Sequence, residues 1–206
     1  MVRRIRTAVI VSGSGSNLQA LIDANGRNET PHMEISLVVS SKRDSYALER
    51  AKQNSIPSAV VERKKYKQDI LGFERELLVR LIEYEIEFII LAGFLTIFTK
   101  EFTERFNNRI INIHPALIPS FCGKGYYGLK VHKAALEYGV KVSGATVHYV
   151  NEIVDGGQII LQKAVDVLED DTPETLQKRI MLQAEQELLP KAAEMIAKRI
   201  AEESRC

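Results

Sequence analysis

Short apolar runs along the chain alternate with longer segments in which apolar residues recur every three or four positions. The short runs predict strands, and the longer segments predict helices. Strands are expected at residues 6–12, 33–40, 58–61, 87–92 and 109–113, and helices at 17–24, 46–54, 69–84 and 100–106. Strands and helices that alternate in this way form βαβ units, so we predict an α/β fold with a mostly parallel central sheet.

The pattern changes after residue 114. Residues 115–130 contain two Pro and several Gly with little periodicity, and a loop of this length is usually kept for function. Beyond it we expect a helix at 131–138, strands at 142–150 and 158–165, and a final helix from about 173 to 201. Thr172 supplies a hydroxyl cap for that last helix and Pro173 its first position, whereas Pro190 could break it.

Length, composition and charge narrow the class of protein. The chain has 206 residues, which fits one domain, and 45% of them are hydrophobic, enough for a sizeable core. The 28 Lys and Arg against 27 Asp and Glu leave a net charge of +1. This balance does not favour a general nucleic-acid or membrane-surface binder, because both need a concentrated positive field.

The start of the chain, its apolar runs and its two cysteines indicate in which cellular compartment the protein is found. The basic start is followed by an apolar run at residues 7–11, which is shorter than the roughly 7–15 residues of a secretory signal. No apolar stretch approaches the ~20 residues of a membrane span. Cys122 lies in a Gly-rich loop and Cys206 is the last residue, so a disulfide framework is not indicated. We therefore expect a cytoplasmic protein with no nucleic-acid or membrane partner.

A glycine-rich turn follows the first predicted strand. Residues 12–17 read Ser-Gly-Ser-Gly-Ser-Asn and lead into a helix, whose free N–H groups and dipole favour an anion such as phosphate. The spacing is not the dinucleotide fingerprint, because its third glycine would fall at Leu18, and no Gly-Lys-Ser/Thr of a P-loop is present. A tight turn without a ligand is the alternative interpretation.

Polar residues that could carry chemistry stand at two places. Asn112 and His114 lie at the carboxyl end of the fifth predicted strand, where open α/β sheets bind ligands, and alternation puts both on one side. Asp155 precedes two glycines in the loop between the last two strands. An amide and a protonated imidazole can stabilise an oxyanion while a carboxylate organises proton transfer, which suits acyl transfer.

Each of these residues also has a purely structural interpretation. His114 could be a hydrogen-bonded strand residue and Asp155 a turn residue. His148 is expected to be a strand residue with a satisfied ring, and His132 to lie near a helix start. His114, His148 and Asp155 could converge on a metal, but no metal-ligand spacing supports this, and Ser14 lacks the surroundings of a hydrolase nucleophile.

Four segments together carry a resemblance. Residues 12–20, 91–95, 112–119 and 147–157 match in order and spacing the motifs of the phosphoribosylglycinamide formyltransferases, which the chain resembles over nearly its whole length. The resemblance implies a single-domain, Rossmann-like three-layer α/β fold over residues 1–206. Its N-terminal half, about 1–110, would bind the mononucleotide, and its C-terminal half, about 111–206, would hold the folate and the catalytic groups.

The resemblance also implies roles for individual residues. The catalytic residues would be Asn112, His114 and Asp155. The phosphate and ribose of glycinamide ribonucleotide would be bound by Gly15, Ser16, Asn17, Gly93 and Glu185. The folate would be contacted by Leu95, Thr96, Ile97, Phe98, Asn151, Glu152, Ile153 and Val154. Thr146 would place a hydroxyl near the catalytic water.

The implied reaction moves the formyl group of 10-formyltetrahydrofolate to the amine of glycinamide ribonucleotide, a step of de novo purine biosynthesis. The folate would be a cosubstrate, no metal would be needed, and a homodimer is expected. Two positions depart from the family pattern. Thr96 stands where relatives often carry an Arg for the glutamate tail of the folate, and Leu182 stands where a polar residue is common near the ribose.

Three rival functions remain. A formyltetrahydrofolate hydrolase would carry a regulatory domain of about 80 residues before this core, and a methionyl-tRNA formyltransferase would add an RNA-binding domain after it. A non-catalytic folate or nucleotide binder on the same fold could keep all three polar residues for recognition. Replacing Asp155 with Asn would separate enzyme from binder.

Overall fold

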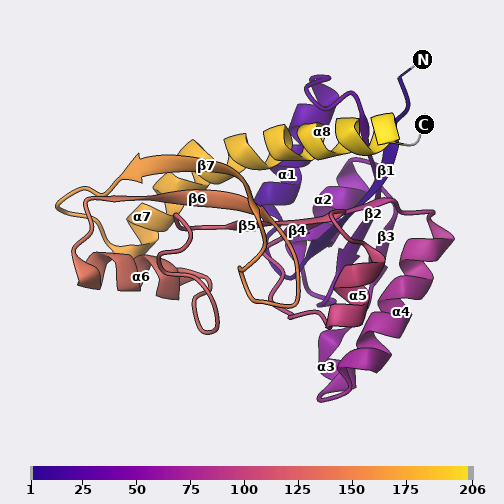
Figure 1. Cartoon of the computed structure of the whole chain (residues 1–206), viewed down its shortest axis with the longest axis horizontal. Helices are drawn as coiled ribbons and strands as arrows, with labels where there is room; N and C mark the ends of the chain where they lie inside the picture. Colours follow the sequence, from indigo (N-terminus) through magenta and orange to yellow (C-terminus); the bar gives the residue numbers. More distant parts are fainter. Residues whose placement is uncertain (1, 204–206) are drawn as a thin grey trace.

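The computed structural model describes residues 2–203 and places seven strands in one sheet (Figure 1). The strands are β1 (Ile5–Val11), β2 (Met33–Ser40), β3 (Ser58–Val60), β4 (Phe88–Ala92), β5 (Ile110–His114), β6 (Val142–Tyr149) and β7 (Ile159–Asp166). Their order is β3-β2-β1-β4-β5-β6-β7. The pairings from β3 to β5 are parallel, and those of β6 with β5 and β7 are antiparallel, so the predicted mostly parallel α/β sheet is confirmed.

Helices cover both faces of the sheet (Figure 1). They are α1 (Ser16–Gly26), α2 (Tyr46–Gln53), α3 (Arg63–Tyr66), α4 (Ile70–Glu83), α5 (Lys100–Arg105), α6 (Leu129–Tyr138), α7 (Pro173–Ile180) and α8 (Gln186–Glu203). Apolar residues of α1, α2, α7 and α8 form one core with the sheet, and those of α4 and α5 form the other. Because β4 is buried along its whole length between these layers, its sequence is apolar throughout.

The sheet order brings three loops to one edge. The strand order reverses at β1, which has β2 on one side and β4 on the other. In the parallel part of the sheet, Val11 pairs with Ala92, and Leu91 pairs with Asn112, so the carboxyl ends of β1, β4 and β5 lie together. Ligands bind at this kind of switch point in open α/β sheets.

The last helical region differs from the prediction at one place. Thr172 caps α7 and Pro173 begins it, as expected. Pro190 does not break the helix, since α8 continues through it, and the irregularity is instead a π-helical turn, η1 (Met181–Glu185), just before α8. Pro190 cannot donate to the carbonyl of Gln186 and its ring crowds that carbonyl.

Most other elements begin and end within two residues of their predicted bounds. The short helix α3 was not predicted, because four residues are too few to show a helical period. Cys122 is a half-buried free cysteine, and Cys206 lies outside the described residues. Among residues 2–203, no helix is both long and apolar enough to cross a membrane.

Candidate active site

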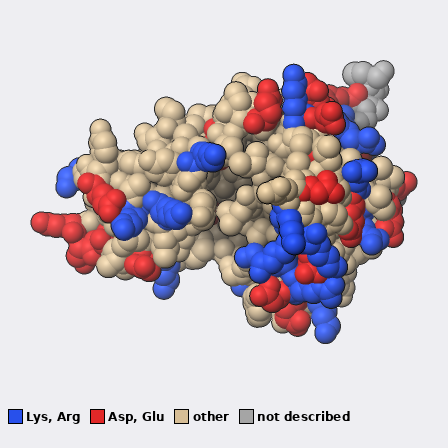
Figure 2. All heavy atoms as spheres, turned by 90° about the horizontal axis from the view of Figure 1, so that it is seen from below, with Lys and Arg blue, Asp and Glu red and all other residues tan. Residues whose placement is uncertain are grey.

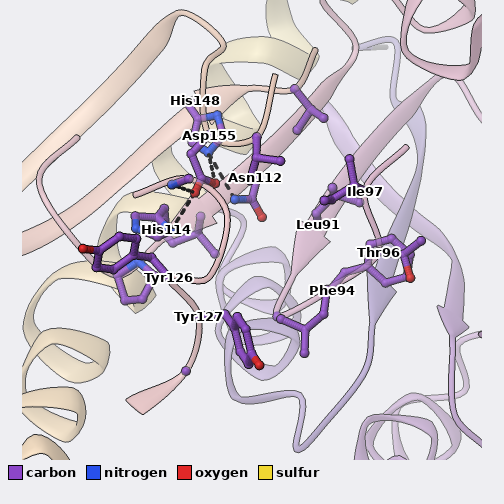
Figure 3. A pocket seen from close by; sticks show the side chains of 18 of the residues that line it. Leu91, Phe94, Thr96, Ile97, Asn112, His114, Tyr126, Tyr127, His148 and Asp155 are labelled. Carbon is purple, nitrogen blue, oxygen red and sulfur yellow. Dashed lines mark hydrogen bonds and ion pairs between the residues drawn. The ribbon is translucent and has the colours of Figure 1, made fainter. Parts of the chain in front are cut away.

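A cavity of about 540 Å³ opens at the carboxyl ends of β1, β4 and β5. The turn after β1, residues 93–98 after β4, the end of β5 and the loop before β7 all contribute to its wall. Figure 2 shows a hollow on this side of the molecule, with Lys and Arg side chains gathered beside it over α3. In Figure 3, Asn112, His114, His148 and Asp155 lie together at one end, across from Leu91, Thr96 and Ile97.

Asn112 is held in the cavity by a histidine from the neighbouring strand. Antiparallel pairing sets Asn112 opposite His148, and the amide nitrogen of Asn112 lies 3.1 Å from Nε2 of His148. Nδ1 of His148 faces the carbonyl of Tyr149 at 2.8 Å, and burial lowers the pKa of this histidine. A carbonyl only accepts, so Nδ1 carries the proton and Nε2 accepts from Asn112. The second N–H of Asn112 is left for a ligand.

His114 is held by a backbone carbonyl of the loop that follows β5. It is 4% exposed, and its Nε2 lies 2.9 Å from the carbonyl oxygen of Phe121, to which it donates. Its Nδ1 therefore faces Asp155, whose Oδ2 is 3.6 Å away. A proton on Nδ1 makes the ring a cation paired with this carboxylate and directed at the cavity.

Asp155 is positioned by backbone contacts. Its φ is +55°, and its Oδ2 accepts from the N–H of Gly123 at 2.8 Å, while Oδ1 lies 3.7 Å from Nε2 of His148. A Cβ on Gly157 would meet the carbonyl oxygen of Tyr149 at 1.7 Å, so only glycine fits there. The two glycines thus let the loop turn sharply enough to deliver the carboxylate between the two histidines.

The cluster suits acyl transfer better than metal binding. It combines an amide donor, an imidazole and a nearly buried carboxylate at one point. His114 and His148 converge with Asp155, but one nitrogen of each ring is already turned to a backbone carbonyl. Within residues 2–203, no three His, Cys, Asp or Glu side chains are placed to hold a metal ion.

The start of α1 forms the other end of the cavity. Gly15 precedes the helix with φ +73°, and a Cβ there would come within 2.7 Å of Ala47. Ser16 and Asn17 line the cavity, whereas Gly15 does not. The amide of Asn17 donates to Glu185 at 2.7 Å, and burial raises the pKa of that carboxyl. Glu185 ends the π-helical turn, a local irregularity often found at functional residues.

The expected folate residues lie on two loops of the wall. Those that line the cavity are Leu95, Thr96, Ile97, Phe98, Asn151, Ile153 and Val154. Gly93, which was expected to bind the ribonucleotide, also lines it. Glu152 does not line it. Leu95, Ile97 and Ile153 are more than half exposed, so they present apolar surface to a ligand.

Sequence reasoning missed several lining residues. Tyr126 and Tyr127 project from the Gly-rich loop into the view of Figure 3, and Gln177 and Met181 reach the cavity from α7 and η1. His148 was expected to have a satisfied ring, which is confirmed, but its place against Asn112 was not foreseen. The signal for it exists only once the β5–β6 register is known.

Two implied roles do not match the structure. Thr146 is fully buried away from the cavity wall, and its hydroxyl donates to the carbonyl of Ala116 at 2.6 Å and accepts from the N–H of Ile118 at 3.1 Å. It holds the loop after β5 rather than a catalytic water. Leu182 is 53% exposed and lines a separate groove instead of the cavity.

His132 is expected to make the folded protein less stable in acid. The ring is fully buried in α6, neither nitrogen has a hydrogen-bond partner among the described residues, and burial, then the nearby His114, lowers its pKa to about 4. Below pH 6.5 the unfolded chain binds a proton there that the folded chain does not, so stability falls as the pH falls towards 4. We expect a loss of about 2 kcal/mol between pH 7 and pH 5 from this residue.

Urea unfolding of the wild type and a His132→Leu variant at both pH values measures this loss. The variant should keep its stability at pH 7 and lose about 2 kcal/mol less on acidification. An identical pH dependence in both proteins would contradict the assignment.

The fold and cavity define an α/β protein with an amide, an imidazole and a carboxylate gathered at the carboxyl ends of its central strands. The chain belongs to the formyl transferase family, whose model matches residues 5–193. It is 42% identical over 195 residues to the human trifunctional purine biosynthetic protein adenosine-3, covering 95% of this chain and 18% of that protein. It is 42% identical over 179 residues to the chloroplastic phosphoribosylglycinamide formyltransferase of Arabidopsis thaliana, covering 87% of this chain and 61% of that one.

A solved structure has a fold similar to that of this chain. The glycinamide ribonucleotide transformylase 1 of Symbiobacterium toebii superposes with a TM-score of 0.87 at 39% identity, over 95% of this chain and 89% of that one. The chain spans less than two thirds of the two curated relatives named above.

Proposed function

We propose that this chain transfers the formyl group of 10-formyltetrahydrofolate to the amine of glycinamide ribonucleotide, a step of purine biosynthesis. One observation carries the proposal: Asn112, His114 and Asp155 lie between the start of α1 and an apolar loop in a single cavity. The printed names of the relatives support it. A hydrolase has no use for a second substrate site, so it does not explain the polar helix start at the far end of the cavity.

The two substrates fit the two ends of the cavity. The phosphate would lie at the start of α1, held by Gly15, Ser16 and Asn17 through N–H groups and the helix dipole. The ribose hydroxyls would reach the carboxylate of Glu185. Gly93 has no side chain, so it would leave room for the ribonucleotide beside it. The folate would lie along residues 95–98 and 151–154, with its formyl group directed at the cluster.

The mechanism follows from the geometry of the cluster. The neutral amine attacks the formyl carbon, and a tetrahedral oxyanion forms. The free N–H of Asn112 and the proton on Nδ1 of His114 stabilise this charge. The carbon–nitrogen bond to N10 of the folate then breaks, and the proton lost by the amine passes to N10 through Asp155. Neither step calls on a metal.

Further proposals concern the whole protein. We expect one domain over residues 1–206, with the halves 1–110 and 111–206 both facing the cavity. A cytoplasmic location and a homodimer remain predictions. Thr96 provides no charge for a glutamate tail, so we expect weak discrimination between folates of different tail length.

The proposal is tested by following folate product from 10-formyl-5,8-dideazafolate with and without glycinamide ribonucleotide. Product that forms only with the ribonucleotide supports the transferase. Product at the same rate without it would make the protein a hydrolase. Binding of both ligands without any product would make it a non-catalytic binder.

A further inference from the structure

The loop between β4 and α5 has almost no polar support of its own. Within the described chain, the backbone groups of residues 94–98 make no hydrogen bond to any other part of the protein. A segment without such bonds is held only by its side chains and its two ends. This segment also supplies five consecutive residues of the cavity wall.

Two rings anchor the loop to the protein core, although both also line the cavity. Phe94 and Phe98 are 8% and 5% exposed, whereas Leu95 and Ile97 between them are 59% and 53% exposed. Phe94 stacks on Phe73 of α4 at a centroid distance of 6.3 Å, and Phe98 stacks on Phe102 of α5 at 4.2 Å. The first and last side chains of the segment, Phe94 and Phe98, therefore pack on the core, while Leu95 and Ile97 between them present exposed apolar surface.

The polar anchor is a single buried carboxylate. Glu74, next to Phe73 on α4, is 4% exposed. Its Oε1 accepts from the N–H of Thr99 at 2.6 Å, and its Oε2 accepts from the hydroxyl of Thr99 at 2.6 Å. Thr99 in turn caps α5 by accepting from the N–H of Phe102. Thr99 is the residue at which the unsupported loop ends.

Glu74 has no cation to balance it. In the described part of the chain, no Lys, Arg or His nitrogen lies within ion-pair distance of its carboxylate. Burying an unpaired carboxylate is costly, and hydrogen bonds to a charged acceptor are among the stronger ones in proteins. Both hydrogen bonds that Glu74 accepts come from Thr99, so the carboxylate is well suited to fix this end of the loop.

We propose that Glu74 is a positioning residue that sets the affinity for the folate by holding residues 94–98 in the shape that receives it. The inference rests on the proposed function, which puts the folate against this loop. If the loop is already ordered before the folate binds, no binding free energy is lost in ordering it, and the affinity for the folate is higher. Glu74 contacts neither substrate in this account, since Thr99 lies between it and the wall.

A Glu74→Gln variant removes the charge and keeps the size of the side chain. We expect the KM for 10-formyl-5,8-dideazafolate, and its Kd measured by titration without ribonucleotide, to rise about tenfold. The KM for the ribonucleotide and kcat should stay within about twofold. Glu101→Gln on the exposed face of α5 is the matched control and should leave all these values unchanged.

A merely structural role predicts a different result. It would lower kcat and raise both KM values together, and that outcome would overturn the inference, as would an unchanged Kd for the dideazafolate. If Glu74→Gln does not fold, Thr99→Val and Thr99→Ser replace it, because only serine keeps the hydroxyl. Val should weaken binding about tenfold relative to Ser, and equal Kd values would refute the proposal.

Titration of the wild type and of Glu74→Gln with the dideazafolate separates the proposed function from the proposed role of Glu74. Wild type that binds the dideazafolate but never turns over would end the proposed function, while the Kd of Glu74→Gln would still decide the role of Glu74. Wild type that turns over normally with an unchanged Kd in the variant would end only the role of Glu74. Wild type that does not bind the dideazafolate would overturn both.

Discussion

An Asp155→Asn variant is expected to lose kcat by a factor on the order of 10³ while binding both substrates almost as well as the wild type. Asparagine has the same shape and keeps an oxygen to accept from the N–H of Gly123, so the loop should stay in place. It cannot hold a proton in transit, and it removes the negative charge that faces Nδ1 of His114. The loss should therefore fall on the chemical step.

Steady-state kinetics with both substrates, together with Kd values from titration, measures this effect. Asp170→Asn changes an exposed turn residue in the same chemical way and should leave kcat unchanged. A kcat for Asp155→Asn within fivefold of the wild type would exclude Asp155 from proton transfer. A large rise in Kd with unchanged kcat would make it a binding residue instead.

An Asn112→Ala variant is expected to lose a factor of about 10²–10³ in kcat, the usual cost of removing one oxyanion donor. The negative charge that Asn112 meets exists only in the transition state, so the KM values should change little. The variant also leaves Nε2 of His148 without its donor, which adds a smaller cost in stability.

The same kinetic assay, with a thermal melt beside it, separates these two effects. Asn107→Ala, an exposed asparagine in the turn before β5, is the control for loss of an amide. If Asn112→Ala instead raises KM and leaves kcat intact, Asn112 binds the ground state and the oxyanion assignment is wrong.

Much of the fold could be predicted because the strands that matter are buried on both faces. The run at Phe88–Ala92 is apolar throughout and can only be a central strand or a short buried helix segment, and its length favours the strand. The π-helical turn at Met181–Glu185 could not be predicted in this way. A single π-helical turn adds one residue to the helix, and this one residue does not change the apolar pattern enough to be recognised.

The candidate site was predicted where its residues share one strand or one motif. Asn112 and His114 lie two apart, so alternation alone placed them together, and the glycines after Asp155 marked a sharp turn. His148 and Glu74 could not be placed, because their partners lie on other elements. A histidine in a strand and a glutamate in a helix look ordinary until the register and the helix packing are known.

The most direct test of the central claim follows the formyl carbon itself. The protein is incubated with 10-[¹³C]formyltetrahydrofolate and glycinamide ribonucleotide, and the label is located by NMR. We predict that the label moves to the amide of N-formylglycinamide ribonucleotide in the wild type, and that it moves on the order of 10³-fold more slowly with Asp155→Asn. Label released as formate, or label that never leaves the folate in the wild type, would contradict it.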